Sequence, residues 1–583
     1  MFGNFFRKYG WLYLPGVVFL ILQNKLSSLI PEALGDAIDL LESGAVTRDG
    51  VLRAAFLLVL LAIGVFFTQF GWRYCVIGNA RRIECAMRES FFVKLQSLPV
   101  SYFARQRSGD LIAYAINDIN AVRMMFGPLL AMAVRGIAIS VFSIASMAGN
   151  IDARMTMFVL LPLPFAVLAI VLLGSLIRTR FTKVQGLFAR ISGFVNESIM
   201  GVKIIKSFAR EDEWEEDYDR LSGDMRDANL SLVRVTSLLG PSITVAFGIS
   251  YAVSLIYGGN LVLSGSMTVG QLVAYQGYLA LVKTPVVQLG RIINLIVRGT
   301  ASYRRLHDIF AVPSVSAGEL AGDAIEFRDR ISVRSLTFRY EEAQNPALDD
   351  ISFELPKGTT LGITGPTGCG KSTLISLLLK LYDVPRGTVF VDGKDLCDLP
   401  AYSMRELCGY VPQDSFLFSD SIRGNIAFYT EGATEEKIRE AAHVADIDPS
   451  DRDTFPEGYE TEVGERGTHL SGGQKQRISL ARALAREPQL LLLDDTLSAV
   501  DSVTEKHIKE RLSAYFAGRT VIVISQKLSA LTDCDNILYM ENGRIAEQGS
   551  HEALIAQGGA YAALWRKQCA DADADAKGGM LLA

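Results

Sequence analysis

The sequence lacks several features that mark common classes of protein. Its seven cysteines include no Cys-x-x-Cys pair and no metal-ligand spacing, which argues against a zinc site or a disulfide framework. The formal net charge is only −5, so bulk charge gives no support for binding to nucleic acid. No small-residue cleavage site accompanies the first long apolar run, so we expect no cleavable signal peptide. We therefore expect reduced, unpaired thiols and no nucleic-acid partner.

What the sequence does contain is long apolar runs. The chain has 583 residues, too many for one core, and 49% of them are hydrophobic, with a mean hydropathy of +0.24. The apolar residues are concentrated before about Val297, in runs that match the roughly 20 residues needed to cross a bilayer. Buried helices of a soluble protein would not repeat at this length. We predict an all-α membrane domain over residues 1–310, with six spans at 11–30, 52–76, 127–147, 155–177, 238–263 and 269–297.

The connections between these spans differ in length and charge. The connection after the first span is acidic, whereas the two long connections, after the second and fourth spans, are rich in Arg and Lys. The positive-inside rule therefore places both termini and both long connections in the cytoplasm. Both long connections carry helical apolar spacing, so we expect the membrane helices to continue into the cytosol. Short breaks at Leu98–Asp110 and at Gly201 indicate either contacts with a second domain or simple helix–turn–helix packing.

Polar side chains also occur inside the predicted spans, where a charge is costly unless it faces protein or a cavity. The candidates are Gln23 in the first span, Arg135 in the third, and Gln276, Lys283 and Arg291 in the sixth. These residues could line a pathway for a transported substrate. They could equally serve interhelical hydrogen bonds, or extend from the helix ends to the membrane surface. The sequence leaves both interpretations open.

The last 270 or so residues have a different character, with short alternating segments in place of long apolar runs. We predict a linker over residues 311–324 and a mixed α/β domain over residues 325–569. Residues 570–583 are rich in Ala and Asp, and we expect them to form a disordered acidic tail.

Three segments of this domain have sequence patterns suited to binding phosphate or Mg²⁺. Gly365–Ser372 fits the pattern G-x-x-x-x-G-K-[ST] between an apolar strand and a helix, so its backbone N–H groups can wrap phosphates. In this pattern Lys371 reaches the β- and γ-phosphates, and Ser372 ligates Mg²⁺. Downstream, an apolar strand ends in Asp494, a second Mg²⁺-binding position. A Ser-Gly-Gly turn before a helix, Ser471–Gly473, predicts a further phosphate contact.

With these residues in view, the chain resembles the ABC transporter family. Its LSGGQ segment looks like the family signature, Tyr340 resembles the aromatic that stacks on adenine, and Gln413 resembles the glutamine that joins Mg²⁺ to the membrane domain. Thr461–Gly467 resembles an exporter-specific segment. The resemblance implies that ATP and Mg²⁺ bind at Tyr340, Gly365, Pro366, Thr367, Gly368, Cys369, Gly370, Lys371, Ser372, Thr373, Gln413 and Asp494, with Ser372, Gln413 and Asp494 as the Mg²⁺ ligands. It assigns the signature to Leu470, Ser471, Gly472, Gly473 and Gln474, and a dimer-interface loop to Ser498 and Asp501.

Six spans followed by this domain are similar to a half-size exporter of the type IV fold. The resemblance covers nearly the whole chain. It implies a dimer in which each ATP lies between the P-loop of one subunit and the signature of the other. It also implies that Leu98–Asp110 and the region around Gly201 are coupling helices.

Two positions depart from the family pattern. Asp495 stands where the family has a catalytic Glu, and Gln526 stands where the family has a switch His. An Asp carboxylate is one methylene shorter, and a displacement of about 1 Å can cost roughly 100-fold in rate. Gln can donate a hydrogen bond to a phosphate but cannot carry the charge of an imidazolium. The chain therefore resembles the degenerate-site half of heterodimeric bacterial multidrug exporters, although drift in an active homodimer is an alternative.

These observations predict an ATP-hydrolysing translocase with an impaired site of its own, in which Lys371, Asp495 and Gln526 are the catalytic positions. The expected partners are a second half-transporter, the lipid bilayer and an amphipathic drug, lipid or peptide. The expected location is the bacterial inner membrane. Lipid or peptide flipping and siderophore import are alternatives on the same fold, and a soluble ABC ATPase of translation or repair is an alternative that the six spans disfavour.

Overall fold

The chain divides into two compact units. The structure is a computed structural model, and it describes residues 8–43, 47–315, 319, 325–341, 343–430, 432–447, 449, 454–464, 467, 470–496, 500 and 502–580. A helical unit comprises residues 1–96 and 107–312, and a sheet unit comprises residues 97–106 and 313–583. Residues 97–106, which the sequence prediction kept in the membrane domain, belong to the sheet unit. There the Ser97 carbonyl accepts a hydrogen bond from the Val315 N–H at 2.8 Å, and Arg105 forms an ion pair with Glu341.

The helical unit confirms the six-helix membrane fold. Six of its described helical runs are long and apolar enough to cross a membrane. Several are longer than the predicted spans, and α10 and α12 reach 38 and 53 residues. Its elements are η1 (Gly10–Leu12), α2 (Tyr13–Glu42), α3 (Arg48–Trp72), η2 (Arg73–Ile77), α4 (Gly78–Gln96), α6 (Ser108–Ala113), η3 (Tyr114–Asp118), α7 (Ile119–Met124), η4 (Met125–Leu129), α8 (Leu130–Ser146), η5 (Met147–Ile151), α9 (Ala153–Leu160), α10 (Leu163–Met200), α11 (Val202–Ser207), α12 (Glu211–Leu263) and α13 (Val269–Ala311).

Helices α2 and α13 approach closely because two glycines face each other. A Cβ on Gly270 would lie only 2.1 Å from the carbonyl oxygen of Gly35. At this point the Asp39 carboxylate accepts hydrogen bonds from the Thr268 hydroxyl and the Gly270 N–H, both at 2.6 Å. Thr268 is the N-cap of α13, so the Asp39 charge also faces the positive end of that helix. Backbone proximity and one carboxylate thus fix this crossing.

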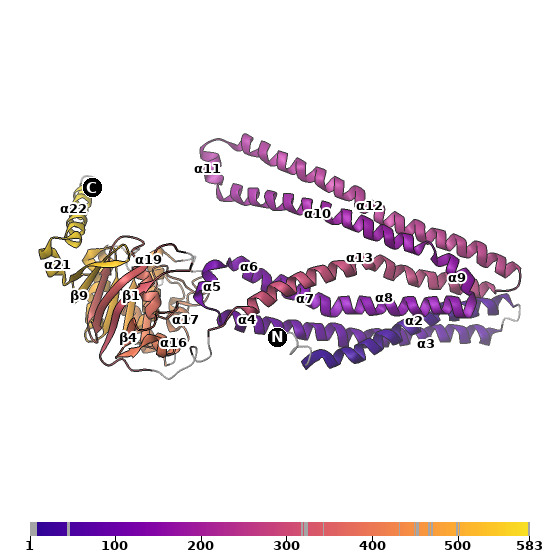
Figure 1. Ribbon diagram of the computed structural model, residues 1–583, viewed down its shortest axis with the longest axis horizontal. Coiled ribbons are helices and arrows are strands. Elements are labelled where there is room, and N and C mark those ends of the chain that lie inside the picture. Colours follow the sequence, from indigo (N-terminus) through magenta and orange to yellow (C-terminus); the bar gives the residue numbers. More distant parts are fainter. Residues whose placement is uncertain are drawn as a thin grey trace. The chain divides into compact units, whose positions relative to one another are not determined.

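Helices α10 and α12 form a hairpin closed by α11. Partway along the hairpin the two helices pack on each other through Val184, Leu187 and Ala228. They contact α13 toward the other end of the hairpin, where Ile170 and Ile243 join a cluster that includes buried residues of α13. Figure 1 shows the hairpin diverging from α13 toward α11. The break predicted at Gly201 is therefore the junction between α10 and the short helix α11.

The sheet unit contains two sheets. The four-stranded sheet has the order β2-β1-β4-β5, and the six-stranded sheet has the order β10-β9-β3-β8-β7-β6. The described elements are α5 (Val100–Arg105), β1 (Arg330–Phe338), β2 (Leu348–Pro356), β3 (Thr360–Thr364), α15 (Lys371–Leu378), β4 (Val389–Val391), β5 (Lys394–Asp395), η6 (Leu396–Asp398), α16 (Ala401–Leu407), β6 (Cys408–Val411), α17 (Ile422–Ala427), α18 (Glu435–Val444), η7 (Gly458–Glu460), α19 (Gly472–Leu484), β7 (Leu490–Asp494), α20 (Ser502–Phe516), β8 (Thr520–Ile524), η9 (Leu528–Ala530), β9 (Asn536–Glu541), β10 (Arg544–Gly549), α21 (His551–Gln557) and α22 (Ala560–Met580).

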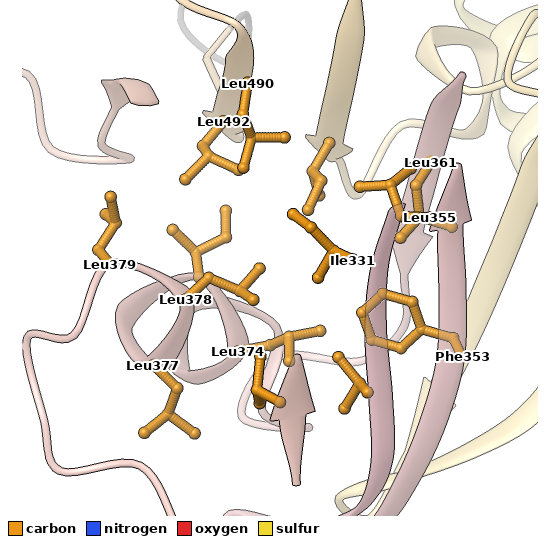
Figure 2. Packing of buried hydrophobic residues seen from close by; sticks show 14 of the residues in the cluster. Ile331, Phe353, Leu355, Leu361, Leu374, Leu377, Leu378, Leu379, Leu490 and Leu492 are labelled. Carbon is orange, nitrogen blue, oxygen red and sulfur yellow. The ribbon is translucent and has the colours of Figure 1, made fainter. Parts of the chain in front are cut away.

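Strand β7 lies between two hydrophobic cores. Its side chains alternate across the sheet, so Leu490 and Leu492 enter the core that contains α15, whereas Leu491 and Leu493 enter the core that contains α19. Figure 2 shows the first core, with Leu374 and Leu378 of α15 between the strands. Burial of each such leucine contributes about 1.5–3 kcal/mol. One strand thereby fixes the positions of two helices.

The structure differs from the predicted disordered tail. Helix α22 begins at Ala560 and continues to Met580, so most of residues 570–583 are helical. The Ala and Asp repeat lowers hydrophobicity, which is why composition suggested disorder, but alanine has the highest helix propensity of all residues. Alanine propensity and continuation from the preceding turn favour the helix.

Candidate functional site

Four site segments meet at one edge of the six-stranded sheet. Strands β3, β8, β7 and β6 are parallel neighbours, so their carboxyl ends lie together. The P-loop, Gly365–Ser372, follows β3, and Gln526 follows β8 by two residues. Asp494 ends β7, Asp495 is the next residue, and Gln413 follows β6 by two residues. The topology therefore brings together segments that are more than 150 residues apart in the chain.

The P-loop conformation requires glycine. Gly365 and Gly370 have φ values of +144° and +102°, in the region that L side chains rarely adopt. A Cβ on Gly365 would lie 2.0 Å from the Met540 carbonyl oxygen, and one on Gly370 would lie 2.4 Å from the Ala347 carbonyl oxygen. Neighbouring Pro366, Thr367 and Gly368 are exposed, and Cys369 is buried. The loop thus combines a fixed base with an open face that can receive a ligand.

Lys371 supplies a positive charge inside this loop. It is the first residue of α15, and its side chain is largely buried. The Lys371 Nζ donates hydrogen bonds to the carbonyl oxygens of Gly365 at 2.8 Å and Pro366 at 2.9 Å, and lies 3.6 Å from the Cys369 Sγ. A cation and the N-terminus of a helix therefore face the same point, an arrangement that suits a phosphate group.

Asp494 and Ser372 supply oxygen ligands suited to Mg²⁺. Asp494 is buried, and burial raises the pKa of its carboxyl group. A hydrogen bond from the Ser372 hydroxyl and the nearby Lys371 charge oppose that rise in pKa, while the Asp495 charge adds to it. Gln413 is exposed at the same sheet edge. The described residues contain no group of three or more His, Cys, Asp and Glu that could hold a metal alone, so Mg²⁺ would need phosphate oxygens as well.

The two unusual positions lie on neighbouring strands. Asp494 pairs with Ile524 in the β7–β8 register, so Asp495 and Gln526 follow these strands side by side. The Asp495 N–H donates to the Ile524 carbonyl oxygen at 2.9 Å, and its backbone has a left-handed φ of +49°. Asp495 is half-buried, whereas the Gln526 side chain is exposed. Both departures from the family pattern therefore fall at one place beside the P-loop.

Residues that sequence reasoning missed hold the Gln526 segment. Gln568 of α22 donates from its Nε2 to the Gln526 carbonyl oxygen at 2.7 Å. The Oε1 of the same Gln568 side chain accepts from the Leu528 N–H at 2.9 Å. Between them, Lys527 pairs with Glu505 of α20 at 2.7 Å. We call these contacts of Gln568 the switch clamp. No pattern could reveal it, because a single Gln more than 40 residues downstream carries no local signal.

The predicted adenine-stacking residue lies in an aromatic group. Tyr340 is half-buried, and its ring makes edge contacts with Phe338 at 5.1 Å and Tyr382 at 5.2 Å between centroids. Its hydroxyl donates to the Thr373 hydroxyl oxygen at 3.1 Å, which ties the aromatic group to α15. Phe338 and Tyr382 had not been predicted as part of the site.

The signature segment belongs to the second core. Ser471 is the exposed N-cap of α19, where its Oγ accepts from the Gln474 N–H at 3.3 Å. The Gln474 Oε1 in turn accepts from the Ser471 N–H at 2.8 Å. This reciprocal capping box leaves the Ser471 hydroxyl hydrogen available to an incoming anion. Leu470 is half-buried, and Gly472 and Gly473 form the first turn. The predicted interface residues Ser498 and Asp501 lie outside the described residues.

Arg482 joins the signature helix to the segment that follows Gln413. Its guanidinium donates to the carbonyl oxygens of Asn425 at 2.8 Å and Phe416 at 2.9 Å, and to the Asn425 Oδ1 at 2.8 Å. It also lies 5.0 Å from the centre of the Phe428 ring. Burial lowers the pKa of Arg482 to about 10. Sequence reasoning missed this residue because all its partners are neutral groups distant in the chain.

The polar residues of the membrane spans separate into two groups. The Gln23 Nε2 lies 3.5 Å from the Gln69 Oε1, and the Gln276 Nε2 donates to the Ser254 Oγ at 3.1 Å. These two amides therefore make interhelical contacts. By contrast, the side chains of Arg135, Lys283 and Arg291 are exposed.

Comparisons with known proteins agree with these features. A family model described as ABC transporter transmembrane region matches residues 13–286, and one described as ABC transporter matches residues 348–498. A probable multidrug resistance ABC transporter ATP-binding/permease protein, YheI of Bacillus subtilis, is 34% identical over 97% of this chain and 97% of its own. The multidrug resistance-like ATP-binding protein MdlA of Escherichia coli is 34% identical over 98% and 96%. A bacterial Atm1-family ABC exporter solved with ATP bound has a TM-score of 0.76 and 27% identity, covering 97% and 98%.

Proposed function

The chain belongs to the ABC transporter family, as a half-transporter that fuses a transmembrane region to an ATP-binding domain, and from this premise we propose that it forms one half of a heterodimeric, ATP-driven exporter. In this proposal its own P-loop side forms a slow ATP site. Its signature completes a faster site on a different half-transporter. The transported molecules are amphipathic drugs, lipids or peptides. Both termini are cytoplasmic, and the membrane is a bacterial inner membrane.

One observation carries the proposal of unequal sites. Asp495 and Gln526 replace the two residues expected to act on the attacking water and the γ-phosphate, and they follow adjacent strands at one sheet edge. The P-loop glycines, Lys371 and Asp494 are all retained around them. Random drift would not concentrate its changes at one catalytic point. This pattern supports a site that keeps ATP binding and has reduced hydrolysis.

The geometry suggests how the chain's own site acts on ATP. Backbone N–H groups of the P-loop and the Lys371 ammonium would bind the β- and γ-phosphates. Mg²⁺, which neutralises phosphate charge when bound, would be held by Ser372 and Asp494 with help from Gln413. The shorter Asp495 carboxylate would polarise an attacking water poorly, and Gln526 would donate a neutral hydrogen bond. ATP would therefore remain bound for long periods and hold the two subunits together.

The signature would serve the partner's ATP. Ser471 and the first turn of α19 present a hydroxyl and backbone N–H groups to an anion, and neither depends on Asp495 or Gln526. Closure around the partner's ATP would reach the membrane helices through Gln413 and through the short helices α5 and α11, which lie in the two predicted coupling regions.

The test compares ATP hydrolysis by this chain alone and with its partner. We expect weak hydrolysis by the purified chain in lipid nanodiscs and robust hydrolysis after co-purification with a second half-transporter. Replacing the partner's catalytic glutamate with Gln should remove most of the rate. The matched change in this chain, Asp495→Asn, should leave most of it.

Two outcomes would separate the alternatives. Robust hydrolysis by the chain alone, abolished by Asp495→Asn, would establish an active homodimer and overturn the proposal. Equal losses from the two matched substitutions in the complex would likewise contradict unequal sites.

A further inference from the structure

Helix α22 is fixed to the sheet unit at its first turn. The Glu547 carboxylate of β10 accepts hydrogen bonds from the Ala560 N–H and from the Tyr561 N–H, the latter at 3.2 Å. A carboxylate in this position also stabilises the positive end of the helix dipole. The Tyr561 side chain is fully buried, and its hydroxyl oxygen lies 2.8 Å from the His551 Nδ1 of α21. The first turn of α22 is therefore held by β10, by α21 and by burial.

One face of α22 runs from this fixed turn to the switch clamp. Tyr561, Trp565 and Gln568 are spaced four and three residues apart, so they share a face of the helix. Tyr561 belongs to an apolar cluster that also contains Leu528, and Trp565 packs against that cluster. The Trp565 ring also makes an edge contact with the His551 ring, at 4.7 Å between centroids. The fixed turn and the clamp are therefore joined by about 10 Å of packed helix.

The Gln526 segment connects α22 to the strand that leads into the P-loop. On one side, the N–H of Ser525 donates to the Ile363 carbonyl oxygen of β3 at 3.1 Å. On the other side, the carbonyl oxygen of Gln526 and the N–H two residues later are both bonded to Gln568. A change in the backbone of this segment therefore affects groups that β3 and α22 hold.

Gln526 belongs both to the edge that carries the P-loop and to the clamp. Ile524 of β8 pairs with Ile363 of β3. Gln526 and Gly365 follow these two residues by two positions each, at the same edge of the sheet. The Gln526 side chain is exposed, whereas its carbonyl oxygen is the acceptor of the clamp. A backbone shift that brings this side chain to a phosphate would leave the carbonyl without its partner unless Gln568 moved with it, and an unpaired carbonyl is unfavourable.

We propose that α22 is a positioning element of this chain's own ATP site. Through two hydrogen bonds to the Gln526 segment, Gln568 sets where the Gln526 side chain meets the γ-phosphate, and α22 in turn becomes more rigid when that phosphate is present. The inference rests on the ATP binding proposed above for this chain's own P-loop. It makes Gln568 a positioning residue, because it acts through Gln526 and touches no substrate atom itself.

The test measures hydrogen exchange of the α22 backbone amides in the intact transporter. The protein, with its partner if one is required, is placed in nanodiscs. Exchange is followed by mass spectrometry in MgADP and in MgATP with an ATP-regenerating system. Peptides of α22 are identified by mass, so the partner does not obscure them. We expect the amides of residues 561–570 to exchange at least about fivefold more slowly in MgATP than in MgADP.

Two variants interrupt the connection at different points. Gln526→Ala removes the side chain that would meet the γ-phosphate and leaves both bonds of the clamp in place. Gln568→Ala removes the clamp and leaves Gln526 in place. Either variant should reduce the difference between the two nucleotides to less than about twofold. Gln557→Ala removes an exposed amide from α21, outside the clamp, and should keep the full difference.

The outcomes separate this inference from the proposed function. If α22 detaches in Gln568→Ala, its amides exchange rapidly in both nucleotides, and Gln526→Ala, which keeps the clamp, decides the question. A difference that survives in Gln526→Ala would overturn the inference, because the protection would then come from closure of the dimer.

Photolabelling with 8-azido-ATP shows separately whether this chain binds ATP. Labelling of this chain without a difference in α22 exchange would overturn the inference and leave the proposed function in place. No labelling at saturating nucleotide would overturn the proposed slow ATP site, and the inference with it.

Discussion

Helix α19 and strand β7 are consecutive in the chain, and yet they differ in what they keep. The signature turn at Ser471 retains its capping box and an exposed anion-binding face. Eleven residues after the end of α19, β7 leads to Asp495, where the usual glutamate is missing. Helix α19 packs in one core and β7 borders both cores, and in the proposed dimer the two elements act on different ATP molecules. A substitution in one part of a continuous segment therefore need not weaken the neighbouring part, when each part serves a different active site.

The largest expected effect comes from disrupting the intact signature turn at the start of α19. Ser471→Arg places a bulky cation at the N-terminus of α19 and should lower ATP hydrolysis by the heterodimer on the order of 1,000-fold, since the partner's ATP loses its signature contacts. The rate is measured in nanodiscs at saturating ATP. Ser513→Arg on the exposed face of α20 is the control. Retention of more than a tenth of the rate would show that this signature does not serve the fast site.

The second-largest expected effect comes from restoring the usual family residues at positions 495 and 526. Asp495→Glu with Gln526→His should raise hydrolysis at this chain's own site about 100-fold, because the carboxylate gains its missing reach and the switch gains an ionisable ring. The measurement uses a complex whose partner site is inactivated, so the rate reports this site alone. The single Gln526→His variant should give only a small part of the increase. An unchanged rate in the double variant would mean that another feature makes the site slow.

A smaller effect comes from the switch clamp. Gln568→Ala removes both hydrogen bonds to the Gln526 segment and should lower the repaired rate by about three- to tenfold, with little change in the KM for ATP. Gln568→Glu keeps the acceptor but loses the donor while it is ionised, so its rate should recover as pH falls toward the pKa of a glutamate. A purely structural role would not produce this recovery.

The smallest expected effect concerns the buried carboxylate of Asp494. The pKa of Asp494 is raised in the folded protein, so its ionisation at neutral pH disfavours the fold. The stabilising contribution of the protonated Asp494 carboxyl is fully present below the ordinary Asp pKa. It is lost as the pH rises through the raised pKa of the folded protein. Asp494→Asn should therefore increase the melting temperature at pH 7 in the absence of Mg²⁺ by about 1–3 °C. The gain should vanish at acid pH or when Mg²⁺-ATP is added to the unmodified protein, and a gain that persists at acid pH would argue against this cause.

The features of the fold and of the site that could be predicted from the sequence are those that depend on a local pattern of residues. The six membrane helices follow from run length, and Gly365–Ser372 follows from a turn that only glycine permits. Arg482 and Gln568 were missed, because their partners are backbone groups of segments that only the tertiary fold brings close. The tail was predicted wrongly, since composition weighs hydrophobicity while a helix that has already begun extends at low cost.

The β7 side chains alternate between two cores, and this alternation has a consequence for the phenotypes of single substitutions. Each leucine of the run from Leu490 to Leu493 borders only one core, and truncation to alanine leaves a cavity on that side alone. Leu490→Ala and Leu492→Ala loosen the packing under the P-loop, whereas Leu491→Ala and Leu493→Ala loosen the packing under the signature helix. Four consecutive and chemically identical positions would therefore give phenotypes that alternate, with a period of two residues, between this subunit's ATP and its partner's.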